Sequence, residues 1–309
     1  MRKHRIKAAP NAFCQNDILR SELITRFPET VFNDTGTRLA GQTLIDFLQD
    51  TDGAIIGLEQ IDSTILKACP DLKIVAKFGV GLNNIDQNAL ADHGVKLGWK
   101  SGVNRRSVSE MTLGFMLGLT HNLFRSDRQL RSGVWLRDGG RQLSQCTVGI
   151  VGFGHIGRDV AALLKPLGCR ILVSEILPVA DAIRTAGCEP VTFDELIAKS
   201  DIVTIHTPLT RKTEGMMCKP VFRAMKDNAI LINTARGEIV VEKDLKQALR
   251  ERWIGGAALD VYNTEPVTDT ELLAFENMAF TPHIGGNTIE AVTAMGQSAI
   301  SHLHDYFSD

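Results

Sequence analysis

The chain has 309 residues, of which 44% are hydrophobic and 23% charged, with a net charge of −2. This length suits two domains, and the composition is that of a folded protein with apolar cores. The near-neutral charge gives no basis for binding nucleic acid or an anionic membrane, and no apolar run approaches the roughly 20 residues that span a bilayer. The N-terminus is basic but lacks the apolar segment of a secretory signal.

The cysteines are scattered along the chain without any C-x-x-C pair. They are Cys14, Cys69, Cys146, Cys169, Cys188 and Cys218. This spacing argues against a zinc ribbon or a disulfide framework and is typical of a reducing compartment. We therefore expect a cytoplasmic protein without a metal site.

Short apolar segments alternate with segments of helical spacing through the first hundred residues. The predicted strands are Ile6–Ala9, Gly53–Ile56, Ile74–Lys77 and Lys96–Gly98. The predicted helices are Asp17–Phe27, Leu39–Gln49, Asp62–Ala68 and Gln87–Asp92. Such alternation predicts an α/β fold with a parallel sheet covered by helices on both faces.

The segment Val108–Arg131 has a different pattern, because it is long and apolar on most faces in its first half. It predicts one helix buried nearly all round. Gly114 and Gly118 lie four residues apart and would let a second helix pack closely. The pattern fits a core helix and a dimer interface equally well.

From Thr147 the alternation of strands and helices resumes. The predicted strands are Val148–Val151, Ile171–Ser174, Ile202–His206, Ala229–Asn233, Ala257–Leu259 and Met278–Thr281. Predicted helices include Ile156–Leu167, Glu242–Glu251 and the last segment, Thr288–Phe307. This second set predicts another parallel sheet.

Residues 147–158 read TVGIVGFGHIGR, a strand followed by G-x-G-x-x-G and a helix start. Gly152 allows the tight turn, Gly154 lets the backbone approach a pyrophosphate, and Gly157 lets helix and strand pack closely. The free N–H groups at the helix N-terminus would bind the phosphates. The next strand ends at Glu175, 18 residues after Gly157. A carboxylate there accepts hydrogen bonds from ribose hydroxyls and repels a 2′-phosphate, which favours NAD over NADP.

Three later strands each end near a residue suited to acid/base or anion chemistry. Arg236, Glu265 and His283 follow the strands predicted to end at Asn233, Leu259 and Thr281. Ligands of open α/β sheets bind at the carboxyl ends of strands, so we expect these side chains to share one crevice.

Taken with these features, several motifs resemble the NAD-dependent D-2-hydroxyacid dehydrogenase family, in its phosphoglycerate dehydrogenase-like branch. They are KFGVGLNNID (77–86), SGVNRRSVSEMT (101–112), the glycine motif, HTPLTRKTEG (206–215), NTARGEIV (233–240), ALDVYNTEP (258–266) and TPHIGGNT (281–288). The resemblance covers nearly the whole chain. It implies reversible, NAD-dependent hydride transfer between a D-2-hydroxyacid and its 2-oxoacid.

The resemblance also implies residue roles. Arg236 would hold the substrate carboxylate, His283 would act as general acid/base, and Glu265 would pair with the histidine. The substrate loop would comprise Lys77, Phe78, Gly79, Val80 and Gly81, in addition to Arg236 and His283. The cofactor would contact Gly152, Gly154, His155, Ile156, Gly157, Glu175, His206, Thr207, Pro208, Thr213, Thr234, Ala235, Asp260 and Gly285. Asp260 would lie near the nicotinamide carboxamide, and His206 would act through its backbone.

The implied architecture is a pair of doubly wound parallel-sheet domains. A Rossmann NAD-binding domain, residues 99–286, would be inserted into a flavodoxin-like substrate domain of residues 1–98 and 287–309. We expect a homodimer through the nucleotide-binding domain and a small anionic substrate, with no nucleic-acid or membrane partner. Because the sequence ends at Asp309, we expect no C-terminal regulatory domain.

Other functions and several substrates stay open at this point. Some relatives are NAD(H)-sensing corepressors without catalysis, but a sensor would not need Arg236, Glu265 and His283 together. Formate dehydrogenases carry glutamine in place of Glu265, and phosphite oxidation is more remote. The substrate could be 3-phosphoglycerate, glycerate/hydroxypyruvate or glyoxylate. Phosphoglycerate enzymes place several arginines around the phosphate, whereas this chain has Lys77 and Gly57 at two of those places.

Overall fold

The computed structural model describes residues 4–308 and divides the chain into two compact units. Unit 1 comprises residues 1–104 and 287–309, and unit 2 comprises residues 105–286. The sequence motifs placed the first boundary between residues 98 and 99. In the structure the last strand of unit 1 ends at Gly98, and residues 99–104 then lead to the first helix of unit 2.

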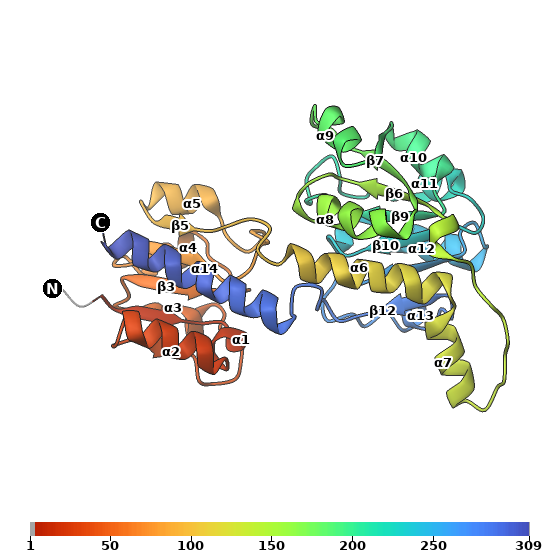
Figure 1. The fold of residues 1–309 in the computed structure, drawn as a ribbon. Helices are drawn as coiled ribbons and strands as arrows, with labels where there is room; N and C mark the ends of the chain where they lie inside the picture. The colour runs from red at the N-terminus through yellow and green to blue at the C-terminus, as the bar shows by residue number, and fades with distance from the viewer. Residues whose placement is uncertain (1–3, 309) are drawn as a thin grey trace. The chain divides into compact units, whose positions relative to one another are not determined.

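Unit 1 holds a five-stranded parallel sheet in the order β2-β1-β3-β4-β5. Its strands are β1 (Ile6–Ala8), β2 (Val31–Phe32), β3 (Gly53–Ile56), β4 (Ile74–Lys77) and β5 (Lys96–Gly98). Its helices are α1 (Asn11–Cys14), α2 (Asp17–Arg26), α3 (Gln42–Leu48), α4 (Ser63–Ala68), α5 (Gln87–Asp92) and α14 (Ile289–Ser308). The last helix, α14, packs against the sheet of this unit and against α2 (Figure 1).

Unit 2 holds a seven-stranded parallel sheet in the order β12-β11-β10-β9-β6-β7-β8. Its strands are β6 (Thr147–Val151), β7 (Arg170–Ser174), β8 (Glu189–Pro190), β9 (Ile202–Ile205), β10 (Ile230–Asn233), β11 (Gly256–Leu259) and β12 (Met278–Phe280). Its α-helices are α6 (Arg105–Thr120), α7 (Leu123–Arg131), α8 (His155–Leu164), α9 (Ala180–Thr185), α10 (Phe193–Lys199), α11 (Lys219–Ala224), α12 (Glu242–Arg250) and α13 (Thr270–Leu273). Short 3₁₀ turns are Leu143–Gln145, Lys165–Leu167 and Gly237–Ile239.

Each sheet is covered on both faces, as the sequence predicted. Successive strand residues point to opposite faces, and in β10 Leu231 joins one apolar cluster while Ile230 and Ile232 join the other. In unit 1, Ile55 and Ile56 of β3 divide in the same way. The structure therefore confirms two doubly wound parallel-sheet units. Among residues 4–308 no helix is both long and apolar enough to cross a membrane.

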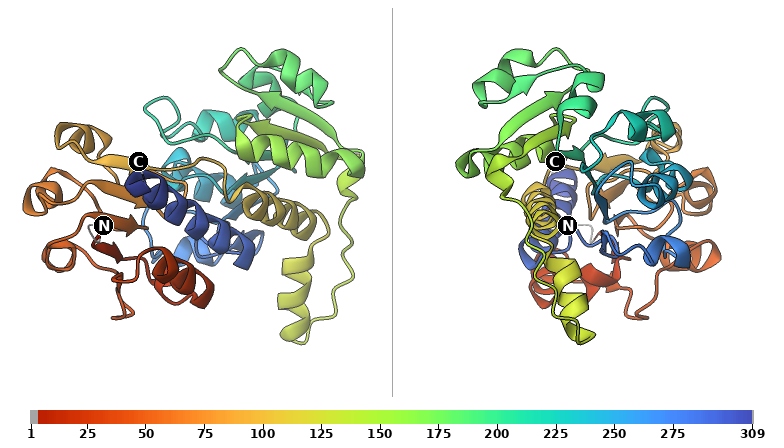
Figure 2. Two further views of the ribbon diagram at one scale, coloured as in Figure 1. Left: turned by 60° about the vertical axis from the view of Figure 1, so that its left-hand side comes forward. Right: turned by 90° about the vertical axis from the view of Figure 1, so that its right-hand side faces the viewer.

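The prediction of one helix over Val108–Arg131, buried nearly all round, is wrong. The helix ends at Thr120, Asn122 takes a left-handed conformation with φ 57°, and α7 begins at Leu123 with no buried residue. A Cβ at Gly118 would lie 2.2 Å from the Phe124 ring, so Gly118 makes room for the following helix and not for a more distant one. Two views show α7 projecting away from the sheet of unit 2 (Figure 2).

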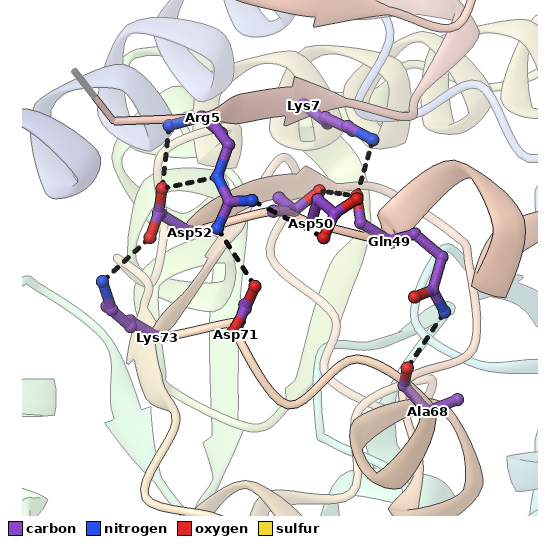
Figure 3. Close-up of polar contacts among 9 residues, drawn as sticks. Arg5, Lys7, Gln49, Asp50, Asp52, Ala68, Asp71 and Lys73 are labelled. Carbon is purple, nitrogen blue, oxygen red and sulfur yellow. Dashed lines mark hydrogen bonds and ion pairs between the residues drawn. The ribbon is translucent and has the colours of Figure 1, made fainter.

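Charged side chains fasten the amino ends of the unit 1 strands (Figure 3). Asp52, which precedes β3, accepts hydrogen bonds from the backbone N–H of Arg5 at 3.0 Å and from Lys73 Nζ at 2.8 Å. Burial would raise the pKa of Asp52, but the bonds from Lys73 and Arg5 outweigh it and hold the pKa well below its usual range. The carboxylate therefore ties together the chain leading into β1, β3 and β4.

Asp201 has the same place in unit 2, directly before β9. It accepts hydrogen bonds from the backbone N–H of Thr147 at 2.8 Å, from Lys226 Nζ at 3.1 Å and from Arg141 at 3.2 Å. Burial would raise its pKa, and these donors lower it below the usual range. Each sheet therefore has one aspartate, Asp52 in unit 1 and Asp201 in unit 2, that connects the amino ends of its strands through hydrogen bonds.

Candidate active site

The glycine loop between β6 and α8 is shaped by close backbone approach. Gly152 has φ 96°, and a Cβ there would lie 2.6 Å from the carbonyl oxygen of His206. A Cβ at Gly157 would lie 2.1 Å from the carbonyl oxygen of Gly152. Neither position can hold another residue without moving the backbone. Gly154, in contrast, has no atom within 4 Å of its Cβ position, so its surroundings are open.

This open side of the loop fits a dinucleotide pyrophosphate. Helix α8 begins at His155, its N-cap is Gly154, and no side chain caps it. The positive end of the helix dipole at this N-terminus therefore favours a bound anion. Thr207, which follows β9 beside this loop, has a buried Oγ1 without a hydrogen-bond partner in the described part of the chain. An unpaired buried hydroxyl is costly, and a bound ligand would satisfy it.

Glu175 lies directly after β7 and contacts the glycine loop. Its Oε2 accepts a hydrogen bond from the backbone N–H of Phe153 at 2.7 Å, and its Oε1 accepts from Ile176 and Leu177. The sequence did not indicate the bond to Phe153, since it depends on how the two loops meet. Ile176 and Leu177 are 88% and 62% exposed, so an apolar surface lies beside the carboxylate.

The loop after β9 carries the other predicted cofactor contacts. The imidazole of His206 is buried and its Nε2 lies 2.9 Å from Thr204 Oγ1, while burial lowers the pKa of His206 to about 3. The ring is therefore neutral and packed inside unit 2. After Pro208, the Thr213 hydroxyl donates to the Pro208 carbonyl at 2.7 Å and holds the loop in shape.

Arg236 follows β10 in a loop held by its own neighbours. The Asn233 side chain donates to the Arg236 carbonyl at 2.8 Å and accepts from the Ala235 N–H at 3.0 Å. Thr234 is buried, with its Oγ1 3.2 Å from Thr112 Oγ1 of α6. Burial lowers the pKa of the Arg236 guanidinium, against the opposing charges of Glu238 and Glu265. An arginine stays charged even so, and a partly buried guanidinium is suited to binding a carboxylate.

His283 and Glu265 lie within hydrogen-bond distance of each other, in the loops that follow β12 and β11. His283 Nδ1 lies 2.7 Å from Glu265 Oε2, and the side chains are 45% and 38% exposed within this chain. The other carboxylate oxygen accepts the Tyr262 N–H at 3.1 Å. His283 Nε2 has no hydrogen-bond partner among residues 4–308. A histidine with one nitrogen held by a carboxylate and the other free is arranged for proton transfer.

Asp260 holds the loop that carries His283. Its Oδ1 accepts from the Ile284 N–H at 2.8 Å and from Thr281 Oγ1 at 2.6 Å, and its Oδ2 accepts from the Gly285 N–H at 2.8 Å. Tyr262 adds a bond from its hydroxyl to the Thr281 carbonyl at 2.9 Å. His283 itself has φ 55°, in the left-handed region. The predicted role of Asp260 beside the nicotinamide stays a prediction. The anchoring role that the structure adds had no signal in the sequence.

The remaining predicted residues lie in unit 1, after β4. Lys77 is 4% exposed, and its ammonium donates to the carbonyl of Gly57 and to Asn84 Oδ1, the latter at 2.8 Å. Phe78 is buried and meets Phe13 edge-on. Gly79 has φ 132°, and the N–H groups of Val80 and Gly81 make no hydrogen bond among residues 4–308. Free N–H groups on a turn can bind an anion. The Lys77 ammonium, in contrast, makes hydrogen bonds to Gly57 and Asn84 within unit 1.

The predicted site residues lie in both units: residues 77–81 are in unit 1, and the others are in unit 2. Arg236, Glu265 and His283 follow the neighbouring strands β10, β11 and β12, as the sequence predicted for parallel strand ends. The glycine loop, Glu175 and the loop at 206–213 follow β6, β7 and β9 of the same sheet. No group of three or more metal-ligating side chains occurs within the part of the chain that the structure describes.

Comparison with known proteins connects these features to one family. A family model described as "D-isomer specific 2-hydroxyacid dehydrogenase, NAD binding domain" matches residues 113–285. The chain is 34% identical over 275 residues to a glyoxylate reductase of Thermococcus onnurineus, covering 86% of this chain and 82% of the relative. It is 36% identical over 240 residues to a D-3-phosphoglycerate dehydrogenase of Archaeoglobus fulgidus, covering 77% of this chain and 46% of that longer protein.

The fold agrees with this family. A crystal structure from Polaromonas sp. JS6 66, described as of the D-isomer specific 2-hydroxyacid dehydrogenase type, superposes with a TM-score of 0.89 at 26% identity. The match covers 99% of this chain and 97% of that one.

Proposed function

Since this chain belongs to the D-isomer specific 2-hydroxyacid dehydrogenase family and is an NAD-dependent oxidoreductase, we propose that it reduces a small 2-oxoacid to the D-2-hydroxyacid. In the balanced reaction, 2-oxoacid, NADH and one proton give 2-hydroxyacid and NAD⁺. The observation that carries the proposal is the His283–Glu265 pair, with Nδ1 and Oε2 at 2.7 Å and Nε2 free, on the sheet that carries the glycine loop.

His283 acts as the general acid in this proposal. Its protonated ring donates the Nε2 proton to the carbonyl oxygen, which becomes the hydroxyl of the product, and in the reverse direction the same nitrogen removes that proton. The Glu265 carboxylate accepts a hydrogen bond from Nδ1–H, fixes the orientation of the ring and stabilises the imidazolium. Bound NADH supplies the hydride.

Arg236 binds the substrate carboxylate through its guanidinium. Unit 1 has anion donors of its own in the free N–H groups of Val80 and Gly81, and we propose residues 1–98 and 287–309 as the substrate domain. The glycine loop and the N-terminus of α8 bind the pyrophosphate, Glu175 binds the adenosine ribose, and Thr207 contributes its unpaired hydroxyl.

We favour a substrate without a phosphate group. Lys77, the cation on the substrate loop, already donates to Gly57 and Asn84. Gly57 offers no side chain where phosphoglycerate enzymes often carry arginine. Glyoxylate or hydroxypyruvate needs only the carboxylate to be neutralised. The 34% identity to a protein named glyoxylate reductase over 86% of this chain supports the same choice.

Two other functions fit the site less well. Glu265, which can hold a protonated His283, suits a reaction that transfers a proton and therefore disfavours formate oxidation. A regulator that only senses NAD(H) has no use for a His–Glu pair with a free Nε2, and the enzyme is favoured over it.

The test is an NADH absorbance assay on the purified protein with glyoxylate, hydroxypyruvate, 3-phosphohydroxypyruvate and pyruvate. We expect the highest kcat/KM with glyoxylate or hydroxypyruvate. A clear preference for 3-phosphohydroxypyruvate would reject the substrate class while keeping the reaction. Tight NADH binding without turnover of any substrate would reject the enzyme.

We also infer a homodimer formed through unit 2. Helix α7 buries none of its residues, and the exposed apolar side chains on it and on the following segment are Leu123, Leu130, Val134, Trp135 and Leu136. Trp135 alone is 79% exposed, and such a patch is unfavourable in water unless it is covered. Light scattering should give about twice the chain mass of 33.9 kDa.

A charge introduced on this surface tests the dimer. Trp135→Glu should give a monomer, while the control Ile18→Glu, which changes an exposed side chain of α2 in unit 1, should remain a dimer. A monomeric wild type would contradict the inference.

The six cysteines are all free thiols, which supports a reducing compartment, and we place the protein in the cytoplasm.

A further inference from the structure

Helix α6 makes a direct hydrogen bond to the loop that carries His283. The hydroxyl of Ser107 donates to the carbonyl oxygen of Gly285 at 2.5 Å, and the side chain is 6% exposed. Gly285 is buried, and a Cβ there would lie 2.8 Å from Asp260 Oδ2 and 3.5 Å from Met111 Sδ. The loop is therefore held between the Asp260 carboxylate on one side and α6 on the other.

The Ser107 bond completes the anchoring of this loop. Asp260 accepts the N–H groups of Ile284 and Gly285, which fixes the donors that follow His283. These bonds leave the Gly285 carbonyl as a buried acceptor, and Ser107 is the group that satisfies it. A buried carbonyl without a donor is costly, so the loop would shift if the hydroxyl were removed.

The same bond lies beside both crossings of the chain between the units. The chain enters unit 2 at Arg105 and leaves it at Gly286. Ser107 is in the first turn of α6, and Gly285 is the residue before the exit. One hydrogen bond inside unit 2 therefore ties the entering segment to the leaving segment, two residues away from His283.

We infer that Ser107 is a positioning residue for proton transfer, one that holds the His283 loop against α6. It does not touch the reacting atoms. Its hydroxyl sets the path of the backbone from Gly285 back to His283, and with it the position of the free Nε2. Small displacements of a catalytic group lower the rate of the chemical step more than they lower cofactor binding. The inference rests on the proposed role of His283.

The experiment compares three variants of the full chain in the 2-oxoacid reduction assay. Ser107→Ala removes the hydroxyl, and Ser107→Thr keeps it. Thr120→Val is the matched control, because the Thr120 hydroxyl is also buried in α6 but donates only to Met116 and Leu117 of the same helix. The readouts are kcat, the KM for NADH, the solvent deuterium isotope effect on kcat and the thermal midpoint.

We expect Ser107→Ala to lower kcat about tenfold, with a larger solvent isotope effect, an unchanged KM for NADH and a thermal midpoint like that of Thr120→Val. Ser107→Thr should regain most of the activity, and Thr120→Val should keep the wild-type kcat. The inference is overturned if Ser107→Ala keeps the wild-type kcat, if Ser107→Thr is as slow as Ser107→Ala, or if Thr120→Val is equally slow.

His283→Ala separates this failure from failure of the proposed function. If His283→Ala keeps its turnover, the acid/base role is wrong whatever Ser107 does. If His283→Ala is inactive while Ser107→Ala turns over normally, only the positioning role is wrong.

Discussion

The two ends of the parallel strands carry polar groups of opposite kinds. At the amino ends, Asp52 and Asp201 are nearly buried, with side chains 9% and 13% exposed, and each accepts hydrogen bonds from several donors. At the carboxyl ends of unit 2, His283 and Glu265 are 45% and 38% exposed, and one imidazole nitrogen is left free. Charged groups whose hydrogen bonds are all made within the protein stabilise the fold. A polar group that keeps an unbonded nitrogen or oxygen can act on a ligand.

The comparison predicts that substitutions at the two ends affect different measurements. The largest effect should come from His283→Ala, which removes the proton donor. We expect kcat for 2-oxoacid reduction to fall about 1,000-fold, with the free energy of unfolding and NADH binding unchanged. Steady-state kinetics, urea denaturation and NADH titration measure these three quantities. A loss of stability as large as the loss of activity would remove the distinction between the two ends.

The second prediction concerns the amino ends. Asp201→Asn or Asp52→Asn should lower the free energy of unfolding by about 2 kcal/mol, because charged donors lose a buried charged acceptor. The kcat should stay within about twofold of wild type. Urea denaturation gives the first quantity. The control is Glu189→Gln, whose ion pair with Arg170 is exposed and should contribute little. Equal effects at Glu189 and Asp201 would show that burial is not what matters.

A third prediction concerns the imidazole of His206, which lies after the carboxyl end of β9 but is buried inside unit 2. His206 has a pKa lowered to about 3 in the folded chain, below its ordinary value of 6.5. The unfolded chain therefore binds more protons between these values, and stability falls as the pH is lowered through that window. At about pH 5 the loss is about 2 kcal/mol. His206→Gln should flatten the acid side of the stability profile, and an unchanged profile would contradict the assignment.

The smallest effect should come from Glu265→Gln. The amide keeps the shape of the side chain but no longer stabilises the imidazolium, so reduction at neutral pH should slow about tenfold. Steady-state kinetics of the variant and the wild type measure this, and a KM for NADH that rises as much as kcat falls would indicate a packing role for Glu265.

What the sequence predicted well depended on local patterns. Alternating apolar segments placed most strands of both sheets, and the glycine spacing placed the turn between β6 and α8. The sequence placed Arg236, Glu265 and His283 after the ends of three strands, which the structure shows to be neighbours in the sheet. The two-residue edge strands β2 and β8 were missed, because segments so short carry no periodic signal.

What the sequence did not predict depends on particular side-chain contacts, which periodic patterns of apolar residues do not show. The break between α6 and α7 follows from the Phe124 ring lying on Gly118 and from the left-handed Asn122. The role of Lys77 toward substrate stays a prediction, and the hydrogen bonds of its ammonium to Gly57, after β3, and to Asn84, in the loop after β4, had no signal in the sequence. The bond from Ser107 to Gly285 joins residues 178 positions apart. Nothing in the residues near Ser107 indicates that partner.

The acid role of His283 is tested by the rate of NADH oxidation with glyoxylate, measured for the wild type, His283→Ala and Asp201→Asn side by side. We expect rapid oxidation by the wild type and Asp201→Asn, and loss of nearly all activity in His283→Ala while it still binds NADH. Near-normal oxidation by His283→Ala would contradict it.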